Sequence, residues 1–338
     1  MSNNTTEALR SNARFNVLDG WRAMSILLVL ACHLLPIGPK FLQLNYAIGV
    51  LGMSLFFTLS GFLVTHILIS RPQVFDFLVR RFLRILPLAW LYILIALSTH
   101  PVSREAWFAH VFFYANYPPK PLIHVTDHLW SLCVEMHFYI GLALLVSMLK
   151  KRGLLLIPLI CIAITAIRIF NLEHVSVITH FRVDEILAGS ILALIYNRQL
   201  GITLFNMMSK INYAYLWVLL LISCHPDAGF MNYFRPYFAA TLVGVTLLNQ
   251  NTQFARLLES RWLFYIASIS FALYVIHPLL ESTWLGSGDI IEKYSKRPLL
   301  FLVLFLCAHI STFYYEQKVM AWGKNISRKF KSVRSNEC

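Results

Sequence analysis

Three polar residues in the first apolar segment have types that could bind an anion and move a proton. Asp19 and Arg22 stand near its start, and His33 follows Arg22 by eleven positions. Eleven steps of 100° return to within about 20° of the same helix face, with an axial separation of about 16 Å. We therefore expect a guanidinium near one membrane surface and an imidazole deeper in the bilayer. The alternative is that all three residues are structural. Asp19 would then cap the start of the helix, Arg22 would anchor it at the membrane surface, and His33 would be an interfacial histidine.

A second basic group follows the next apolar segment. Arg80, Arg81 and Arg84 stand within five residues, at spacings that bring them to one helical face. Guanidinium groups bind phosphates bidentately, so together with Arg22 they could bind a phosphate-rich carrier such as coenzyme A. The same cluster is also an ordinary topological signal at the entrance of a membrane span.

A polar stripe interrupts the apolar stretch that begins near residue 128. His128, Ser131 and Glu135 are spaced by three and four residues, which places them on one side of a helix. A buried carboxylate needs a partner, so Glu135 is either an interhelical contact or a group that orients or moves a proton in a catalytic cavity. No nucleophile-elbow motif surrounds Ser131, so we treat Ser131 and His128 as candidate substrate contacts rather than as a Ser/His pair.

Two further positions are candidate substrate contacts with equally good structural explanations. Arg182 lies one turn before Glu185, which predicts an ion pair, and Ser60 precedes Gly61 in an apolar segment. Small residues of this kind let helices pack closely, and they also let a substrate approach the backbone.

The segments that must position these residues are apolar and long. The chain has 338 residues, of which 58% are hydrophobic and 13% charged, about half the charged share of a soluble domain. Apolar runs near membrane-spanning length cover residues 17–36, 46–69, 82–98, 129–149, 153–170, 183–197, 211–224, 233–248, 262–279 and 298–317. We predict an all-α, polytopic integral membrane protein of about ten transmembrane helices, with one transmembrane domain over residues 1–338 and no separate soluble domain.

The placement of the basic residues explains the net charge of +13. Most of the 29 lysines and arginines fall between spans on the side of the N-terminus, which predicts that both termini are cytoplasmic. Residues 318–338 are predicted to form a basic cytoplasmic tail beside anionic lipid. A nucleic-acid partner is therefore not expected. The six cysteines show no metal-ligand spacing, so no metal is expected either.

The order of these motifs resembles membrane acyltransferase family 3, and the likeness covers nearly the whole chain. The matching segments are Leu18-Asp19-Gly20-x-Arg22-Ala23 with His33, Phe56-Phe57-x-x-Ser60-Gly61-Phe62-Leu63, Arg81-x-x-Arg84-Ile85-x-Pro87, His128-x-Trp130-Ser131-Leu132-x-Val134-Glu135-x-x-Phe138-Tyr139, Arg182 through Gly189, and Ser268 through Pro278. Trp21 departs from the leucine that the family often has at its position.

The resemblance implies a ten-span protein of the bacterial inner (plasma) membrane. Such a protein moves an acyl group, usually acetyl, from cytoplasmic acyl-CoA to a hydroxyl of a cell-surface or exported carbohydrate. By the same likeness His33 is catalytic, Arg22, Arg81 and Arg84 bind the donor or shape its site together with Asp19, and Glu135 is a further functional position. No esterase-like domain is expected after the last span. The chain therefore either completes the transfer without another protein, as a monomer or a homo-oligomer, or passes the acyl group to a partner protein.

We expect His33 to act as the general base for direct attack of the hydroxyl on the thioester, and a covalent acyl-histidine is the less favoured variant.

Two other classes of protein remain open. A transporter of a sugar or lipid-linked glycan would also place polar groups inside spans, although no internal repeat is evident. A noncatalytic assembly subunit would leave the imidazole and the arginines unexplained.

Overall fold

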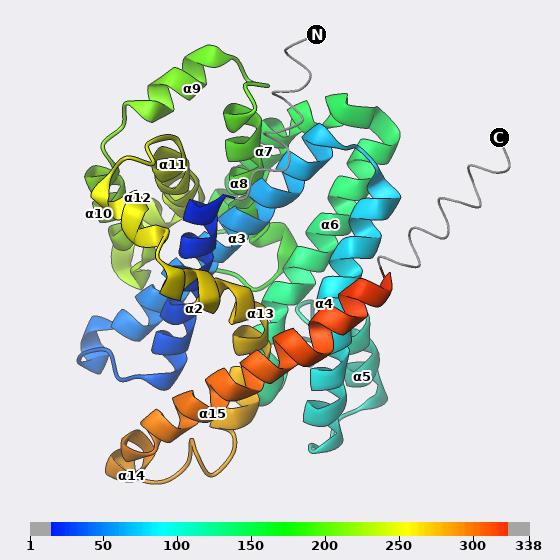
Figure 1. Ribbon diagram of the computed structural model, residues 1–338, viewed down its shortest axis with the longest axis vertical. Helices are drawn as coiled ribbons and strands as arrows, with labels where there is room; N and C mark the ends of the chain where they lie inside the picture. The colour runs from blue at the N-terminus through cyan, green and yellow to red at the C-terminus, as the bar shows by residue number, and fades with distance from the viewer. Residues whose placement is uncertain (1–14, 324–338) are drawn as a thin grey trace, which may run out of the picture. The chain divides into compact units, whose positions relative to one another are not determined.

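The computed structural model describes residues 15–323, and within this range the chain forms helices and connecting turns with no strand. The α-helices are α2 (Asn16–Leu34), α3 (Leu44–Ser70), α4 (Val74–Ser98), α5 (Arg104–Val111), α6 (Trp130–Leu149), α7 (Ile157–Phe170), α8 (Asp184–Tyr196), α9 (Ile202–Ser209), α10 (Tyr213–Cys224), α11 (Arg235–Leu248), α12 (Gln253–Leu258), α13 (Arg261–Glu281), α14 (Ile290–Ser295) and α15 (Arg297–Ile310) (Figure 1). The predicted all-α class is confirmed.

Shorter helical segments connect or extend these helices. The 3-10 segments are η1 (Lys40–Leu42), η2 (His124–Leu129), η3 (Lys150–Leu156), η4 (Thr179–Phe181) and η5 (Pro226–Phe234), and a π-helical segment, η6 (Ser311–Glu316), continues α15. Of the predicted basic tail, residues 318–323 continue this helix, and residues 324–338 lie outside the described range.

Six helical stretches of the described chain are long and apolar enough to cross a bilayer. They are Asn16–Leu34, Lys40–Ser70, Val74–Ser98, His124–Phe170, Arg261–Glu281 and Arg297–Gly323. A seventh arises if α9 and α10, which meet at 90°, form one broken span. The helices α7, α8 and α11 have 14, 13 and 14 residues, fewer than the roughly 20 that a bilayer requires. A multi-pass membrane protein is thus supported, while ten spans and cytoplasmic termini stay predictions.

The chain divides into two compact units, of which the first comprises residues 15–72, 144–176 and 180–268 of the described range. In this unit α3 packs extensively on both α2 and α8. The crossing of α3 and α8 depends on glycine, because a Cβ on Gly61 would lie 1.8 Å from the carbonyl oxygen of Ile186, and one on Gly189 would lie 2.0 Å from that of Thr58. The two backbones therefore touch, as small residues in membrane helices allow.

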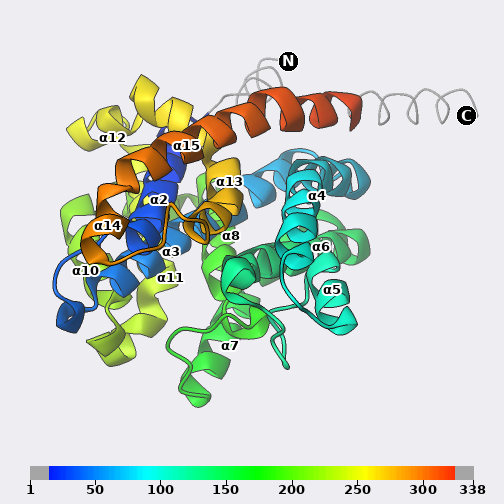
Figure 2. The same cartoon turned by 90° about the horizontal axis from the view of Figure 1, so that it is seen from below.

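The second unit comprises residues 73–143, 177–179 and 269–323 of the described range. Its helix α4 runs beside α6, and the rings of Phe77 and Tyr139 join them at 5.8 Å (Figure 2). Pro87 lies inside α4 without ending it. The hydroxyl of Tyr315, in η6, donates to the Pro87 carbonyl at 3.2 Å.

Candidate functional site

The helix α2 carries the first predicted group, Asp19, Arg22 and His33, in unit 1. Arg22 donates through Nη1 to Asp19 Oδ1 at 3.4 Å, and both side chains are mostly buried. His33 lies in the last turn of the helix and is exposed. His33 is therefore not buried within the protein, although it lies in an apolar helix.

The face of α2 between Arg22 and His33 is covered by packed side chains. Ile26 and Val29 point to the same side as the two polar residues by helical spacing, and they are only 4% and 3% exposed. Val29 packs against Gly52 of α3. The predicted alignment on one helix is thus present, with an apolar contact between its two ends.

Two arginines of the second basic group, Arg81 and Arg84, lie near Glu135 of the predicted stripe in unit 2, whereas Arg80 is exposed. The Arg81 guanidinium lies over the ring of Tyr139, with Cζ 5.9 Å from the ring centroid. The Tyr139 hydroxyl donates to the Glu135 carboxylate, which is 5% exposed. Arg84 and Glu135 are both close enough for their charges to act on Arg81. The spacing of the two arginines was predicted. Tyr139 stands in the family motif, but its contacts with Arg81 and Glu135 were not predicted.

Glu316 lies in the same region of unit 2, close enough to Arg84 for the two charges to interact. Its carboxylate accepts hydrogen bonds from Ser311 at 3.0 Å and from Thr312 at 3.3 Å. All three residues belong to the π-helical segment η6. In the sequence this carboxylate could be recognised only by its place in an apolar span. Its hydrogen bonds within η6 could not be predicted, because α-helical spacing does not describe a π-helical segment.

The predicted stripe of unit 2 divides into two contacts. His128 lies in η2, before α6 begins, and Glu135 faces Tyr139 as described above. Ser131 shares a hydrogen bond of 2.5 Å with the Tyr274 hydroxyl, which also donates to the His128 carbonyl at 2.5 Å. The His128 ring lies 5.5 Å from that of His277. Ser131 and His128 thus bind α13 rather than form a nucleophile with its base.

Arg182 belongs to a cluster of five fully buried charged residues in unit 1. Arg182 contacts Glu185 at 3.3 Å, and Glu185 also accepts from Arg235 at 2.8 Å and from Ser54 at 3.0 Å. We call these five residues the buried charge cluster: Arg168, Arg182, Asp184, Glu185 and Arg235. Each is at most 1% exposed.

Only the pair of Arg182 and Glu185 follows from sequence spacing. Arg168 and Asp184 form the second ion pair of the buried charge cluster, and they come from α7 and α8. Ser60, the remaining candidate, lies in α3 beside the glycine crossing and is 8% exposed. Within residues 15–323, no three His, Cys, Asp or Glu side chains gather as a metal site would require.

The chain belongs to the acyltransferase 3 family, because residues 15–316 match the family model described as an acyltransferase domain. The resemblance found in the sequence is thereby confirmed. The class defined by fold and family is a multi-pass membrane acyltransferase.

Among its curated relatives is the O-acetyltransferase OatA of Staphylococcus aureus (strain NCTC 8325 / PS 47), with 26% identity over 306 residues, 77% of this chain and 49% of that protein. The putative peptidoglycan O-acetyltransferase YrhL of Bacillus subtilis (strain 168) is 28% identical over 221 residues, 53% of this chain and 33% of that protein. The peptidoglycan O-acetyltransferase OatA of Listeria monocytogenes is 29% identical over 152 residues, 36% of this chain and 22% of that protein. The chain thus spans at most about half the length of these relatives, and no solved structure matches it significantly.

Proposed function

We propose that this chain is a membrane O-acetyltransferase that moves an acetyl group from acyl-CoA at the cytoplasmic face of the inner membrane to a hydroxyl of cell-wall carbohydrate. The observation that carries the proposal is the family match over residues 15–316, which contains every motif named above. The acceptor, peptidoglycan, is proposed from the relatives, two of which are named as peptidoglycan O-acetyltransferases. We infer acyl-CoA as the donor from the arginine clusters, and the cytoplasmic face as its side of the membrane from the predicted placement of the basic residues.

In the proposed reaction His33 acts as the general base. The carbohydrate hydroxyl oxygen attacks the thioester carbonyl carbon, and the imidazole removes the hydroxyl proton. The carbon–sulfur bond then breaks, and the same proton passes to the departing CoA sulfur. An imidazole can accept and release a proton near neutral pH, as both transfers require. The exposure of His33 at the end of α2 supports this role, because a base must reach its substrate.

The arginines of the two predicted groups bind the anionic donor in this proposal. Arg22 is oriented by Asp19, and Arg81 is held by Tyr139, which is itself bonded to Glu135. Glu135 therefore acts as a positioning residue for Arg81. The substrate roles of His128, Ser131, Arg182 and Ser60 stay predictions, since all four are buried in packing contacts. Transfer is completed by this chain, alone or as a homo-oligomer, or through a partner protein.

The test of the base is His33→Ala, assayed in membrane vesicles for transfer of labelled acetyl from acetyl-CoA to glycan. Loss of general base catalysis should lower the rate by about 10² to 10⁴. The matched control is His100→Ala, which also removes an exposed histidine, at the end of α4. Transfer by His33→Ala at the rate of the control would remove this residue from the mechanism.

A further inference from the structure

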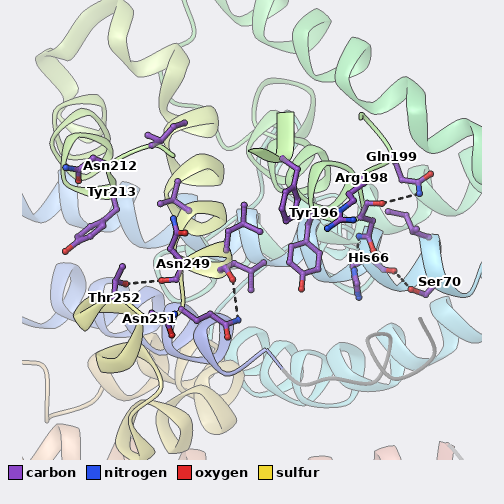
Figure 3. A pocket seen from close by; sticks show the side chains of 18 of the residues that line it. His66, Ser70, Tyr196, Arg198, Gln199, Asn212, Tyr213, Asn249, Asn251 and Thr252 are labelled. Carbon is purple, nitrogen blue, oxygen red and sulfur yellow. Dashed lines mark hydrogen bonds between the residues drawn. The ribbon is translucent and has the colours of Figure 1, made fainter. Parts of the chain in front are cut away.

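A cavity of about 1540 Å³ lies within unit 1, where the C-terminal ends of α3, α8 and α11 meet the start of α10. Small-molecule pockets usually have about 300–1,000 Å³, so this cavity has room for a large ligand. Figure 3 shows Arg198 and Gln199 on one side of it, Asn212, Tyr213 and Asn249 on the other, and Tyr196 between the two groups.

The charges of this cavity are all positive. Its lining includes Arg71, Lys151 and Arg198, and it includes no aspartate or glutamate of the described chain. Lys151 and Arg198 are exposed to the cavity side of the surface, and among residues 15–323 neither forms an ion pair with a carboxylate. We call this feature the basic cavity; its charge suits a ligand with several negative groups.

The walls of the basic cavity also suit a nucleobase. Asn212, Asn249 and Asn251 line it with amides, which can both donate and accept hydrogen bonds. The ring of Tyr213 stacks on Phe254 at 5.9 Å and is thereby fixed in the wall. An aromatic ring held in this way can stack on a base, and such stacking does not depend on which base is present.

The position of the basic cavity links it to the proposed catalytic helix. Phe15, directly before α2, packs on Tyr196 at 5.6 Å and on His66 at 5.3 Å, and both partners line the cavity. Arg22 lies about 10 Å further along α2, and His33 about 27 Å from Phe15. A ligand bound in the cavity must therefore be extended to bring a reacting group toward His33.

We propose that the basic cavity binds the phosphorylated nucleotide end of the acyl donor, with Arg198 and Lys151 on its phosphates. This inference rests on the proposed function and deepens it, because it separates the site that holds the nucleotide from the residues that act on the thioester. Arg198 is preset for this role, since its Cζ is held 5.0 Å from the ring centroid of Phe205.

The test is calorimetric titration of the full chain in nanodiscs of neutral lipid with CoA and, separately, with 4′-phosphopantetheine, which lacks the nucleotide. Loss of one charged hydrogen-bonding partner should weaken CoA binding about tenfold to a hundredfold in Arg198→Ala and in Lys151→Ala. Phosphopantetheine binding should not change in either variant. The matched control is Lys210→Ala, an exposed cation outside the cavity, which should bind CoA as the unmodified chain does.

The outcomes separate this inference from the proposed function. CoA binding that is unchanged in a folded variant carrying both Arg198→Ala and Lys151→Ala overturns this proposal for the basic cavity and leaves the proposal of acyl transfer intact. Equal weakening of CoA and phosphopantetheine also overturns it, because the nucleotide is then not what the cations hold. Anionic phosphatidylglycerol in the nanodisc should compete weakly; if it abolishes CoA binding, the cavity is a lipid headgroup site and the proposal is wrong. No step of the titration requires acetyl transfer or an acceptor.

Discussion

Glu185 is the residue that joins the separate parts of the buried charge cluster. Its carboxylate contacts Arg182, Arg235 and Ser54, which come from three different parts of the chain. Burying charges is costly, and removing one partner leaves the other uncompensated. The cluster therefore makes the packing of unit 1 depend on charge balance as well as on apolar contacts.

Replacing this carboxylate should be strongly destabilising. We expect Glu185→Gln to lower the free energy of unfolding by about 3–5 kcal/mol, because Arg182 and Arg235 lose their negative partner. Unfolding in mixed detergent micelles measures the effect. Glu259→Gln, which changes an exposed carboxylate, is the matched control. Equal stability of the two variants would show that the cluster does not hold the unit together.

The candidate residues were predictable where one helix carries them. The pairs Asp19 with Arg22 and Arg182 with Glu185 follow from helical spacing, and the structure contains both. The contact of Ser131 with Tyr274 joins positions 143 residues apart. Spacing rules describe neighbours along a helix, and they say nothing about which other helix lies opposite.

At the scale of elements, the crossing of α3 and α8 is the contact most sensitive to side-chain size. Gly61 and Gly189 each face a carbonyl of the other helix at a distance that leaves no room for a methyl group. Since backbone oxygens cannot rotate away as side chains can, the helices themselves must separate to admit one. Gly141 of α6 offers a contrast, because no atom lies within 4 Å of its ideal Cβ position.

This contrast gives a prediction for two alanine variants. Gly61→Ala should destabilise the protein by about 1–3 kcal/mol through overpacking. Gly141→Ala should be neutral or stabilising by up to about 1 kcal/mol, because alanine favours the helix. Thermal unfolding in the same detergent compares them. The close crossing would be refuted by Gly61→Ala unfolding at or above the temperature of Gly141→Ala.

Long apolar helices could be predicted from sequence more closely than short ones. The run predicted at 129–149 corresponds to α6 (Trp130–Leu149), and that at 262–279 to α13 (Arg261–Glu281). The short helices α9, α12 and α14 were not predicted, since each has eight residues or fewer and buries little apolar surface. The π-segment η6 was also missed, because side-chain spacing in a π-helix differs from that of the α-helix.

At the scale of the whole molecule, the candidate residues fall into two groups by unit. Asp19, Arg22, His33, Ser60 and Arg182 belong to unit 1, and Arg81, Arg84, His128, Ser131 and Glu135 belong to unit 2. Interleaved segments build each unit, so the order of motifs along the chain does not indicate this division. Each group has its own arginines, Arg22 and Arg182 in unit 1 and Arg81 and Arg84 in unit 2.

The most direct measurement compares membrane vesicles from cells that carry or lack this chain, supplied with labelled acetyl-CoA and a cell-wall glycan acceptor. The account predicts alkali-labile acetyl on the glycan, matched by release of CoA thiol that depends on the acceptor, only where the chain is present. Equal labelling in both kinds of vesicle, or uptake of glycan without CoA release, would contradict it.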